Sequence, residues 1–196
     1  AVFYSITNCQ EGLRGVSFGN FLIKQVADEL GRDFPQLKTF ATLSPVPGFG
    51  EWLMNGDYAL TMDDHPTAIR KIIGKLRVRQ PPEPLIGPDI QIELSRLCAY
   101  YLMYAKRDKA PLDPVARFHL ANGARLERLN WMGDTSPAGL TRSLGFTVNY
   151  VYRLTDVERN HEAYAKAYGI TASRTFQRLA RMGRRATSRP SRTGVE

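Results

Sequence analysis

The chain has 196 residues, of which 43% are hydrophobic and 23% charged. That composition is typical of a globular domain and excludes a wholly disordered protein, and no apolar run reaches the roughly 18 residues of a membrane span. The two cysteines, Cys9 and Cys98, form neither a disulfide framework nor a zinc-binding spacing. Because the sequence starts at Ala1 with a strand-like segment, we interpret it as a piece of a longer protein.

The formal charge of +8 is concentrated at the end of the chain. From Arg174 onward there are seven arginines and one acid, so six of the eight net positive charges lie there. Phe176, Leu179 and Ala180 share one helical face, and Gly183 is expected to end that short helix. We therefore predict a folded region over residues 1–183 and a basic, disordered tail over 184–196. Nucleic-acid binding is not expected, because such binding also needs a folded scaffold with interleaved aromatic residues.

The first 45 residues have the pattern of a strand–helix–strand unit. Residues 1–9 are rich in β-branched and aromatic side chains, and residues 10–16 form a loop with two glycines. A helix is predicted from Phe18 to Leu30, with Ser17 as its N-cap and Gly31 as its C-cap. A second strand is predicted over residues 37–45. Such a unit places its two strands side by side and parallel.

The rest of the chain predicts a helical insertion and two further strands. Residues 50–111 show helical spacing and no clear strand pattern. Asp113 and Pro114 have the residue types of an N-cap and a first helical position, and Asn122 with Gly123 would end that short helix. Strands are predicted over residues 124–132 and 146–154, separated by a turn or short helix over 136–145.

Three features could carry chemistry on the evidence of residue type alone. The glycine loop over residues 10–16 could cradle an anion at a helix N-terminus, or it could be a plain turn. His119 could be a catalyst or a buried structural histidine, and Ser44 could be a catalytic hydroxyl or a turn residue. His65 and His161 lie beside acidic residues, but the contiguous acids near His65 do not share one face of an element. We therefore expect no metal site.

Six motifs in chain order indicate a protein family. They are YSIxxxQxGLxGVxxGxFLIK, LSPxPGF, RLCAxYL, a segment close to NPVAxFHLxNGA, xNWMxDxS and VNYxY. Together they resemble malonyl-CoA decarboxylases over residues 1–153. The departures are small: Asp113 stands at the first position of the fourth motif, and Arg117 lies between its alanine and phenylalanine.

The resemblance implies a fold and a set of site residues. The fold would be α/β with the mixed central sheet of the acetyltransferase-like (GNAT) superfamily, flanked by helices. The family's helical N-terminal domain and the first strands of its catalytic fold are expected to be missing from this stretch. Ser44 and His119 would be the catalytic pair, and Ser5 and Tyr152 would line the same site. The loop would hold the CoA part of the substrate through Gln10, Gly12, Leu13, Arg14, Gly15 and Val16.

The implied reaction is decarboxylation of malonyl-CoA to acetyl-CoA and CO2. The thioester carbonyl serves as the electron sink, so no metal or other cofactor is expected, and His119 would act as a group that titrates near neutral pH. Two alternatives stay open: an acyl-CoA N-acyltransferase of the same fold, and a non-catalytic nucleic-acid-binding module that uses the arginine-rich tail. We also expect a homo-oligomer in the cytoplasm with no membrane partner, while mitochondrial and peroxisomal locations stay open.

Overall fold

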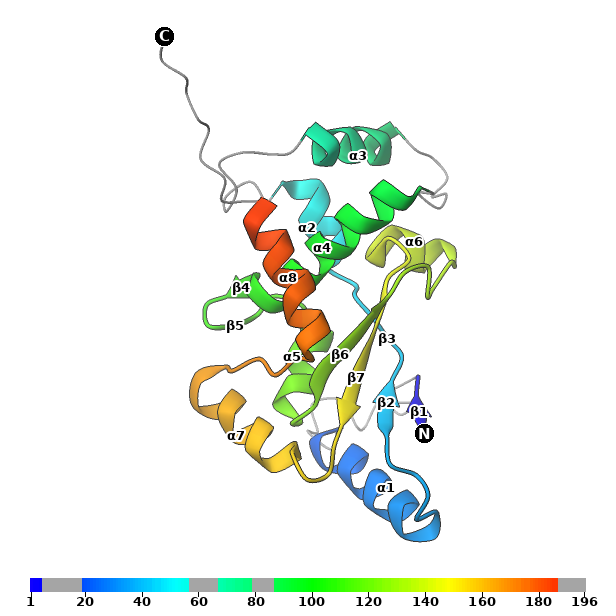
Figure 1. The fold of residues 1–196 in the computed structure, drawn as a ribbon, viewed down its shortest axis with the longest axis vertical. Helices are drawn as coiled ribbons and strands as arrows, with labels where there is room; N and C mark the ends of the chain where they lie inside the picture. Colours follow the sequence, from blue (N-terminus) through cyan, green and yellow to red (C-terminus); the bar gives the residue numbers. More distant parts are fainter. Residues whose placement is uncertain (5–18, 57–66, 79–86, 187–196) are drawn as a thin grey trace, which may run out of the picture.

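The structure is a computed structural model that describes residues 1–4, 19–56, 67–78 and 87–186. Its centre is a five-stranded mixed sheet, and helices surround that sheet (Figure 1). None of the helices in the described ranges has the length and hydrophobicity needed to span a bilayer.

The sheet is built around one central strand, β7 (Thr147–Tyr152). Strand β6 (Arg125–Asn130) pairs with one edge of β7, while β2 (Phe40–Thr42) and β3 (Ser44–Pro45) pair one after the other with its opposite edge. These pairings are antiparallel. The short β1 (Val2–Phe3) lies parallel to β2, which confirms the expected parallel neighbours at the start of the chain.

The alternation of large side chains explains why β7 is central. Phe146, Val148, Tyr150 and Tyr152 alternate along the segment predicted as a strand, and all four are buried. The intervening Val151 is also buried, because neighbouring elements cover the second face as well. The strand therefore ends inside the protein rather than at its surface, and this places Tyr152 in the interior.

The strand predicted over residues 37–45 is divided in two at Leu43. At this break two side chains take the place of backbone ladder bonds: Asn149 Nδ2 donates to the Thr42 carbonyl at 2.7 Å, and Tyr150 N donates to Thr42 Oγ1 at 3.2 Å. The pairing with β7 resumes at Ser44, which lies opposite Val148. Ser44 is thus fixed as the first residue after a break in the sheet.

The helices of the first half differ from expectation at two points. Helix α1 (Gly19–Asp33) continues through Gly31, which was wrongly expected to end it, and Ser17 lies outside the described residues. Residues 50–111 contain α2 (Phe49–Asn55), α3 (Thr67–Val78) and α4 (Pro88–Tyr104), as the helical pattern indicated. The same stretch also holds a small hairpin, β4 (Lys106–Arg107) with β5 (Ala110–Pro111), so the expectation of no strand there is wrong. Strands of two residues are too short to leave an alternating pattern.

The second half follows the sequence more closely. Helices α5 (Pro114–Ala121) and α6 (Pro137–Ser143) lie where they were predicted, whereas α7 (Val157–Ala167) was missed. Helix α8 (Arg174–Ala186) continues past Gly183, so the prediction that this glycine ends the helix is wrong. A Cβ at Gly183 would lie 2.6 Å from the Arg96 carbonyl of α4. The glycine therefore permits close packing of α8 on α4 rather than a turn.

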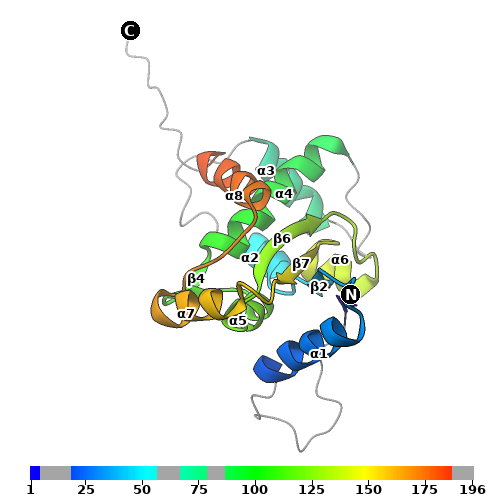
Figure 2. The ribbon, with the colours of Figure 1, turned by 60° about the horizontal axis from the view of Figure 1, so that its bottom comes forward.

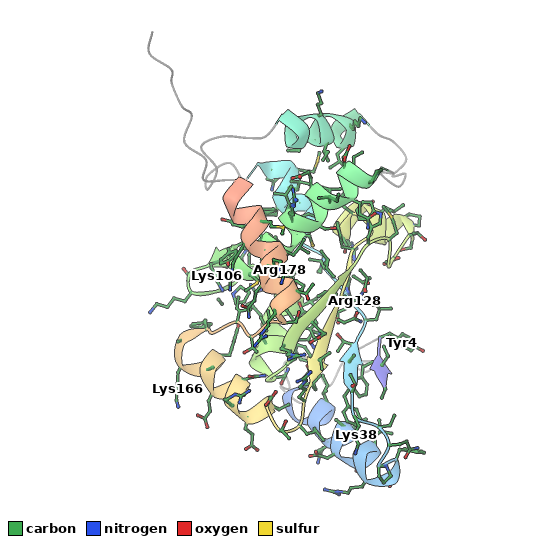
Figure 3. All side chains as sticks on the ribbon, in the orientation of Figure 1. Tyr4, Lys38, Lys106, Arg128, Lys166 and Arg178 are labelled. Atoms are coloured by element: carbon green, nitrogen blue, oxygen red, sulfur yellow. The ribbon has the colours of Figure 1, made fainter. Side chains whose placement is uncertain are left out.

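The packing of α8 changes the interpretation of the basic end of the chain. Arg174, Arg178 and Arg181 are exposed on an ordered helix whose Phe176 and Ala180 are buried, and Figure 3 labels Arg178 there. Three of the seven arginines from Arg174 onward thus lie on the folded body. In both ribbon views α1 lies apart from the group formed by α3, α4 and α8 (Figures 1 and 2).

Candidate active site

The structure brings Ser44 and His119 into direct contact, although 75 positions separate them in the sequence. Ser44 begins β3, and His119 lies in the last turn of α5. Ser44 Oγ and His119 Nε2 are 3.0 Å apart, within hydrogen-bond distance. Both side chains are buried, with 6% of Ser44 and 2% of His119 exposed. The two residues that the resemblance paired are therefore one hydrogen-bonded unit.

Residues of β7 hold the imidazole on its other sides. The Tyr152 hydroxyl lies 2.8 Å from His119 Nδ1. The Tyr150 ring stacks on the imidazole with a centroid distance of 4.4 Å and an interplanar angle of 25°. Because Tyr150 and Tyr152 alternate onto the same face of the strand, a single element fixes both the position and the tilt of His119.

We assign the tautomer of His119 from its hydrogen-bond partners. With the Ser44 hydroxyl proton directed at Thr42 Oγ1, 2.9 Å away, Nε2–H of His119 donates to Ser44 Oγ. In this assignment Nδ1 accepts from the Tyr152 hydroxyl. The result is a continuous chain of donors from Tyr152 through His119 and Ser44 to Thr42.

Burial keeps every member of this chain neutral. Desolvation lowers the pKa of His119 to about 4, so the expectation that it titrates near neutral pH is not met. Desolvation also raises the pKa of Tyr152 above its ordinary value, which keeps the phenol protonated and able to donate. At pH 7 the imidazole thus acts as a neutral donor and acceptor.

The ends of α5 place His119 at this point. Asp113 caps the helix by accepting from Ala116 N at 2.8 Å, and Pro114 follows at the first helical position, both as predicted. Gly123 ends the helix with φ of +78°, a conformation that glycine adopts without strain. A Cβ there would also lie 2.2 Å from the Val157 carbonyl. The helix therefore stops at Ala121, within the turn that carries His119, and the chain continues into β6.

Not all the predicted residues can be placed. The substrate-binding candidates Ser5, Gln10, Gly12, Leu13, Arg14, Gly15 and Val16 lie outside the described residues, as does His65. His161 is exposed, with its Nδ1 2.5 Å from the Ala121 carbonyl oxygen. Over the described ranges, no group of three or more His, Cys, Asp or Glu side chains could hold a metal ion.

Sequence reasoning missed two members of the site, Thr42 and Tyr150. Each lies two positions before a predicted site residue: Thr42 before Ser44, within the strand predicted over residues 37–45, and Tyr150 before Tyr152 on β7. Residues two apart on a strand face the same side, so the strand period could have indicated both residues. Arg128, labelled in Figure 3, belongs to a separate chain of side chains: it donates to Asn130 Oδ1 at 2.8 Å, and Asn130 donates to Asn149 at 3.0 Å.

Comparison with known proteins identifies the family. The family model described as "Malonyl-CoA decarboxylase C-terminal domain" matches residues 1–190. The chain belongs to this family. Its members include the curated mitochondrial malonyl-CoA decarboxylases of the goose Anser anser anser and of Mus musculus. The goose protein is 41% identical over 192 residues, which are 88% of this chain and 38% of that relative. The mouse protein is 40% identical over 197 residues, covering 88% of this chain and 39% of the relative.

Solved structures of malonyl-CoA decarboxylases share the fold. The enzyme from Rhodopseudomonas palustris is 46% identical with a TM-score of 0.79, over 91% of this chain and 41% of that one. The enzyme from Agrobacterium vitis is 44% identical with the same TM-score of 0.79, over 91% of this chain and 44% of that one. The expected α/β class, a mixed sheet flanked by helices consistent with a GNAT-like fold, is confirmed. The chain spans less than half the length of these relatives.

Proposed function

We propose that this chain supplies the catalytic region of an enzyme that converts malonyl-CoA to acetyl-CoA and CO2. The observation that carries the proposal is the buried Ser44–His119 contact in a member of the malonyl-CoA decarboxylase family. The Tyr152 hydroxyl contacts the other ring nitrogen of His119. Residues 1–183 would carry catalysis, and residues 184–196 would take no part in it.

The reaction explains why neutral donors suit the site. Loss of CO2 leaves the electron pair of the broken C–C bond on the thioester as an enolate. The enzyme must then hold the carboxylate out of the carbonyl plane, place donors at the enolate oxygen, and deliver one proton to carbon. A positively charged group would bind the carboxylate of the substrate as well as the enolate. A neutral donor aimed at the thioester oxygen stabilises mainly the enolate.

The donor chain suggests a role for each side chain. Ser44 gives its hydroxyl proton to the carbon, and His119 Nε2–H replaces that proton while Nδ1 takes one from Tyr152. The net proton comes from solvent. Thr42 holds the Ser44 hydroxyl in the resting state, since it accepts the bond that Ser44 donates. The pair needs no covalent intermediate, because the thioester itself holds the electrons.

Substrate binding would depend on the glycine loop. We propose that Gln10, Gly12, Leu13, Arg14, Gly15 and Val16 hold the CoA pyrophosphate, that Ser5 lines the site, and that no metal or cofactor takes part. Backbone N–H groups at a helix start favour bound phosphate, and Arg14 adds a positive charge. We further propose a homo-oligomer in the cytoplasm that binds neither membrane nor nucleic acid. The similarity to bacterial structures supports this location, while the curated relatives are named mitochondrial.

The function is tested by supplying malonyl-CoA to the full-length protein and following acetyl-CoA and CO2. We expect both products in equal amounts, with an unchanged rate in the presence of a chelator. Absence of acetyl-CoA would reject the proposal, and a rate lost to the chelator and restored by a divalent ion would reject the metal-free mechanism. Transfer of the acyl group to an added amine, without release of CO2, would favour the acyltransferase alternative.

Replacement of Tyr152 by phenylalanine is expected to lower kcat about tenfold while the protein stays folded. The ring keeps its packing, but the hydroxyl that donates to Nδ1 and fixes the tautomer is lost. Steady-state kinetics with malonyl-CoA measure the effect. Tyr168→Phe, at a tyrosine that is 39% exposed, is the matched control and should behave as wild type. Equal kcat values for the two variants would show that the Tyr152 hydroxyl has no role.

A further inference from the structure

The chain of side chains that starts at Arg128 continues to the backbone of Thr42. Arg128 Nε donates to Asn130 Oδ1 at 2.8 Å, and Asn130 Nδ2 donates to Asn149 Oδ1 at 3.0 Å. Asn149 Nδ2 in turn donates to the Thr42 carbonyl at 2.7 Å. Side chains therefore join three neighbouring strands, β6, β7 and β2, and the last residue in the chain is the one to which the Ser44 hydroxyl is directed.

The two ends of this chain determine how each amide is turned. A backbone carbonyl only accepts, so Asn149 presents its Nδ2 to Thr42 and its Oδ1 to Asn130. Asn130 then presents its own Nδ2 to Asn149, which leaves its Oδ1 for Arg128. A guanidinium only donates, so this last contact fits the same orientation. Both contacts of the Asn149 amide are thus hydrogen bonds in one orientation only.

Asn149 acts where the backbone ladder of the sheet is interrupted. Leu43 N donates to the Phe3 carbonyl at 2.8 Å, so this N–H serves β1 rather than β7. Two consecutive residues of β7 hold Thr42 instead. The Asn149 amide donates to the Thr42 carbonyl, and Tyr150 N donates to Thr42 Oγ1 at 3.2 Å. The backbone and the side chain of Thr42 are therefore fixed from the same strand.

The position of Thr42 determines where the Ser44 hydroxyl is directed. Thr42 is β-branched, so its χ1 is stiff and its Oγ1 follows the backbone. Thr42 Oγ1 accepts from Ser44 Oγ at 2.9 Å, and Ser44 Oγ lies 3.0 Å from His119 Nε2. Because Thr42 is inaccessible to solvent, with 0% exposed, bulk water does not replace a lost contact there. A shift of Thr42 would thus change the direction of the Ser44 hydroxyl relative to the imidazole.

We infer that Asn149 is a positioning residue, whose amide holds Thr42 and thereby directs the Ser44 hydroxyl. Asn149 alternates with Tyr150 along β7, so its side chain lies on the face opposite to the ring that stacks on His119. It therefore acts through Thr42 and not on the imidazole. The inference rests on the proposed decarboxylation only for its effect on rate, since the hydrogen-bond chain is a matter of geometry.

The main test is the substitution Asn149→Asp in the full-length protein. Aspartate has the same shape, but its carboxylate cannot donate, so two acceptor oxygens face each other at Thr42. Steady-state kinetics with malonyl-CoA are recorded at about pH 8, where a carboxyl group is ionised. We expect kcat to fall about tenfold with KM within about twofold, because a misdirected hydroxyl slows the chemical step more than it weakens binding.

Asn160→Asp is the matched control. Asn160 of α7 makes the same two kinds of contact: its Nδ2 donates to the Gly123 carbonyl at 3.1 Å, and its Oδ1 accepts from Thr171 Oγ1 at 3.4 Å. The substitution also sets a carboxylate against a backbone carbonyl, but it does not act on Thr42. We expect a similar loss of thermal stability in the two variants, with the kcat of Asn160→Asp within about twofold of wild type. An equal loss of kcat in both would leave Asn149 a purely structural role and reject the inference.

Coupling to Ser44 separates positioning from support of the fold. In Ser44→Ala the hydroxyl that Asn149 directs is absent, so the added substitution Asn149→Asp should lower kcat by less than about twofold. Losses that multiply in the double variant would show that Asn149 does not act through Ser44, and would overturn the inference.

Hydrogen exchange at the Tyr150 amide tests the link without substrate. This N–H donates to Thr42 Oγ1, so it should exchange faster in Asn149→Asp than in wild type, while Asn160→Asp should leave it unchanged. Unchanged exchange in Asn149→Asp would contradict the inference whether or not malonyl-CoA is the substrate. Faster exchange in a protein that forms no acetyl-CoA would instead keep the link and reject the proposed function.

Asn130→Asp decides the matter if Asn149→Asp does not fold. The new carboxylate still accepts from Arg128, but it no longer donates to Asn149. The Asn149 amide then gains a hydrogen bond by turning its Nδ2 toward position 130, which sets its Oδ1 against the Thr42 carbonyl. We expect the same two changes, a lower kcat and faster exchange at the Tyr150 amide. The absence of both from folded Asn130→Asp would then overturn the inference.

Discussion

Substitution of His119 by alanine in the full-length protein is expected to lower kcat for acetyl-CoA formation by about 10³-fold. The change removes the Nε2–H donor to Ser44 and the Nδ1 acceptor for Tyr152, so it breaks the proton chain in the middle. It also removes the ring on which Tyr150 stacks, leaving a cavity. Single-turnover kinetics, with thermal unfolding recorded on the same sample, separate the chemical effect from the structural one.

His161→Ala is the matched control for this substitution. His161 is exposed on α7, and its ring contacts only the Ala121 carbonyl among the hydrogen bonds found in the described ranges. We expect its kcat to equal that of wild type. A kcat for His119→Ala within a factor of about three of wild type, in protein shown to be folded, would remove His119 from the mechanism.

Substitution of Ser44 by alanine is expected to lower kcat by about 10²-fold, with the fold intact. The hydroxyl that relays the proton is lost, and the Nε2–H of His119 is left without an acceptor in a buried site. Because Ser44 follows the break in the sheet, the side chain of alanine fits the same backbone. The KM should change less than kcat, since most substrate contacts are expected from the glycine loop.

Ser136→Ala provides the control for the loss of a serine hydroxyl. Ser136 caps α6 by accepting from Gly139 N at 3.1 Å, so this variant should lose about 1 kcal/mol of unfolding free energy and keep its kcat. Ser44→Ala should thus lose kcat and keep its stability, whereas Ser136→Ala should lose stability and keep its kcat. Loss of stability without loss of kcat in Ser44→Ala would instead assign Ser44 a purely structural role.

The sequence predicted the elements that local chemistry determines. Alternation over residues 146–154 identified β7, because a strand buried at the centre of a sheet keeps a period of two. Asp113, Pro114 and Gly123 marked both ends of α5, since a cap, a fixed φ and a positive φ are properties of single residues. The Ser44–His119 pair came from the resemblance and not from spacing, because 75 positions separate the two residues.

Features that depend on tertiary contact could not be read from the sequence. Gly183 looked like a helix end, but its role is to let α8 approach the Arg96 carbonyl of α4. The expectation that His119 titrates near neutral pH failed because burial in the folded protein lowers its pKa. The break at Leu43 depends on hydrogen bonds between Thr42 and a strand more than 100 positions away, so no local pattern could indicate it.

The most direct test of the account is the kcat for malonyl-CoA decarboxylation of the double variant Ser44→Ala/His119→Ala. If Ser44 and His119 act as one hydrogen-bonded unit, the double variant should be no slower than His119→Ala alone, because the first substitution already disables the pair. Losses that multiply, to about 10⁵-fold, would show two independent contributions and contradict the account.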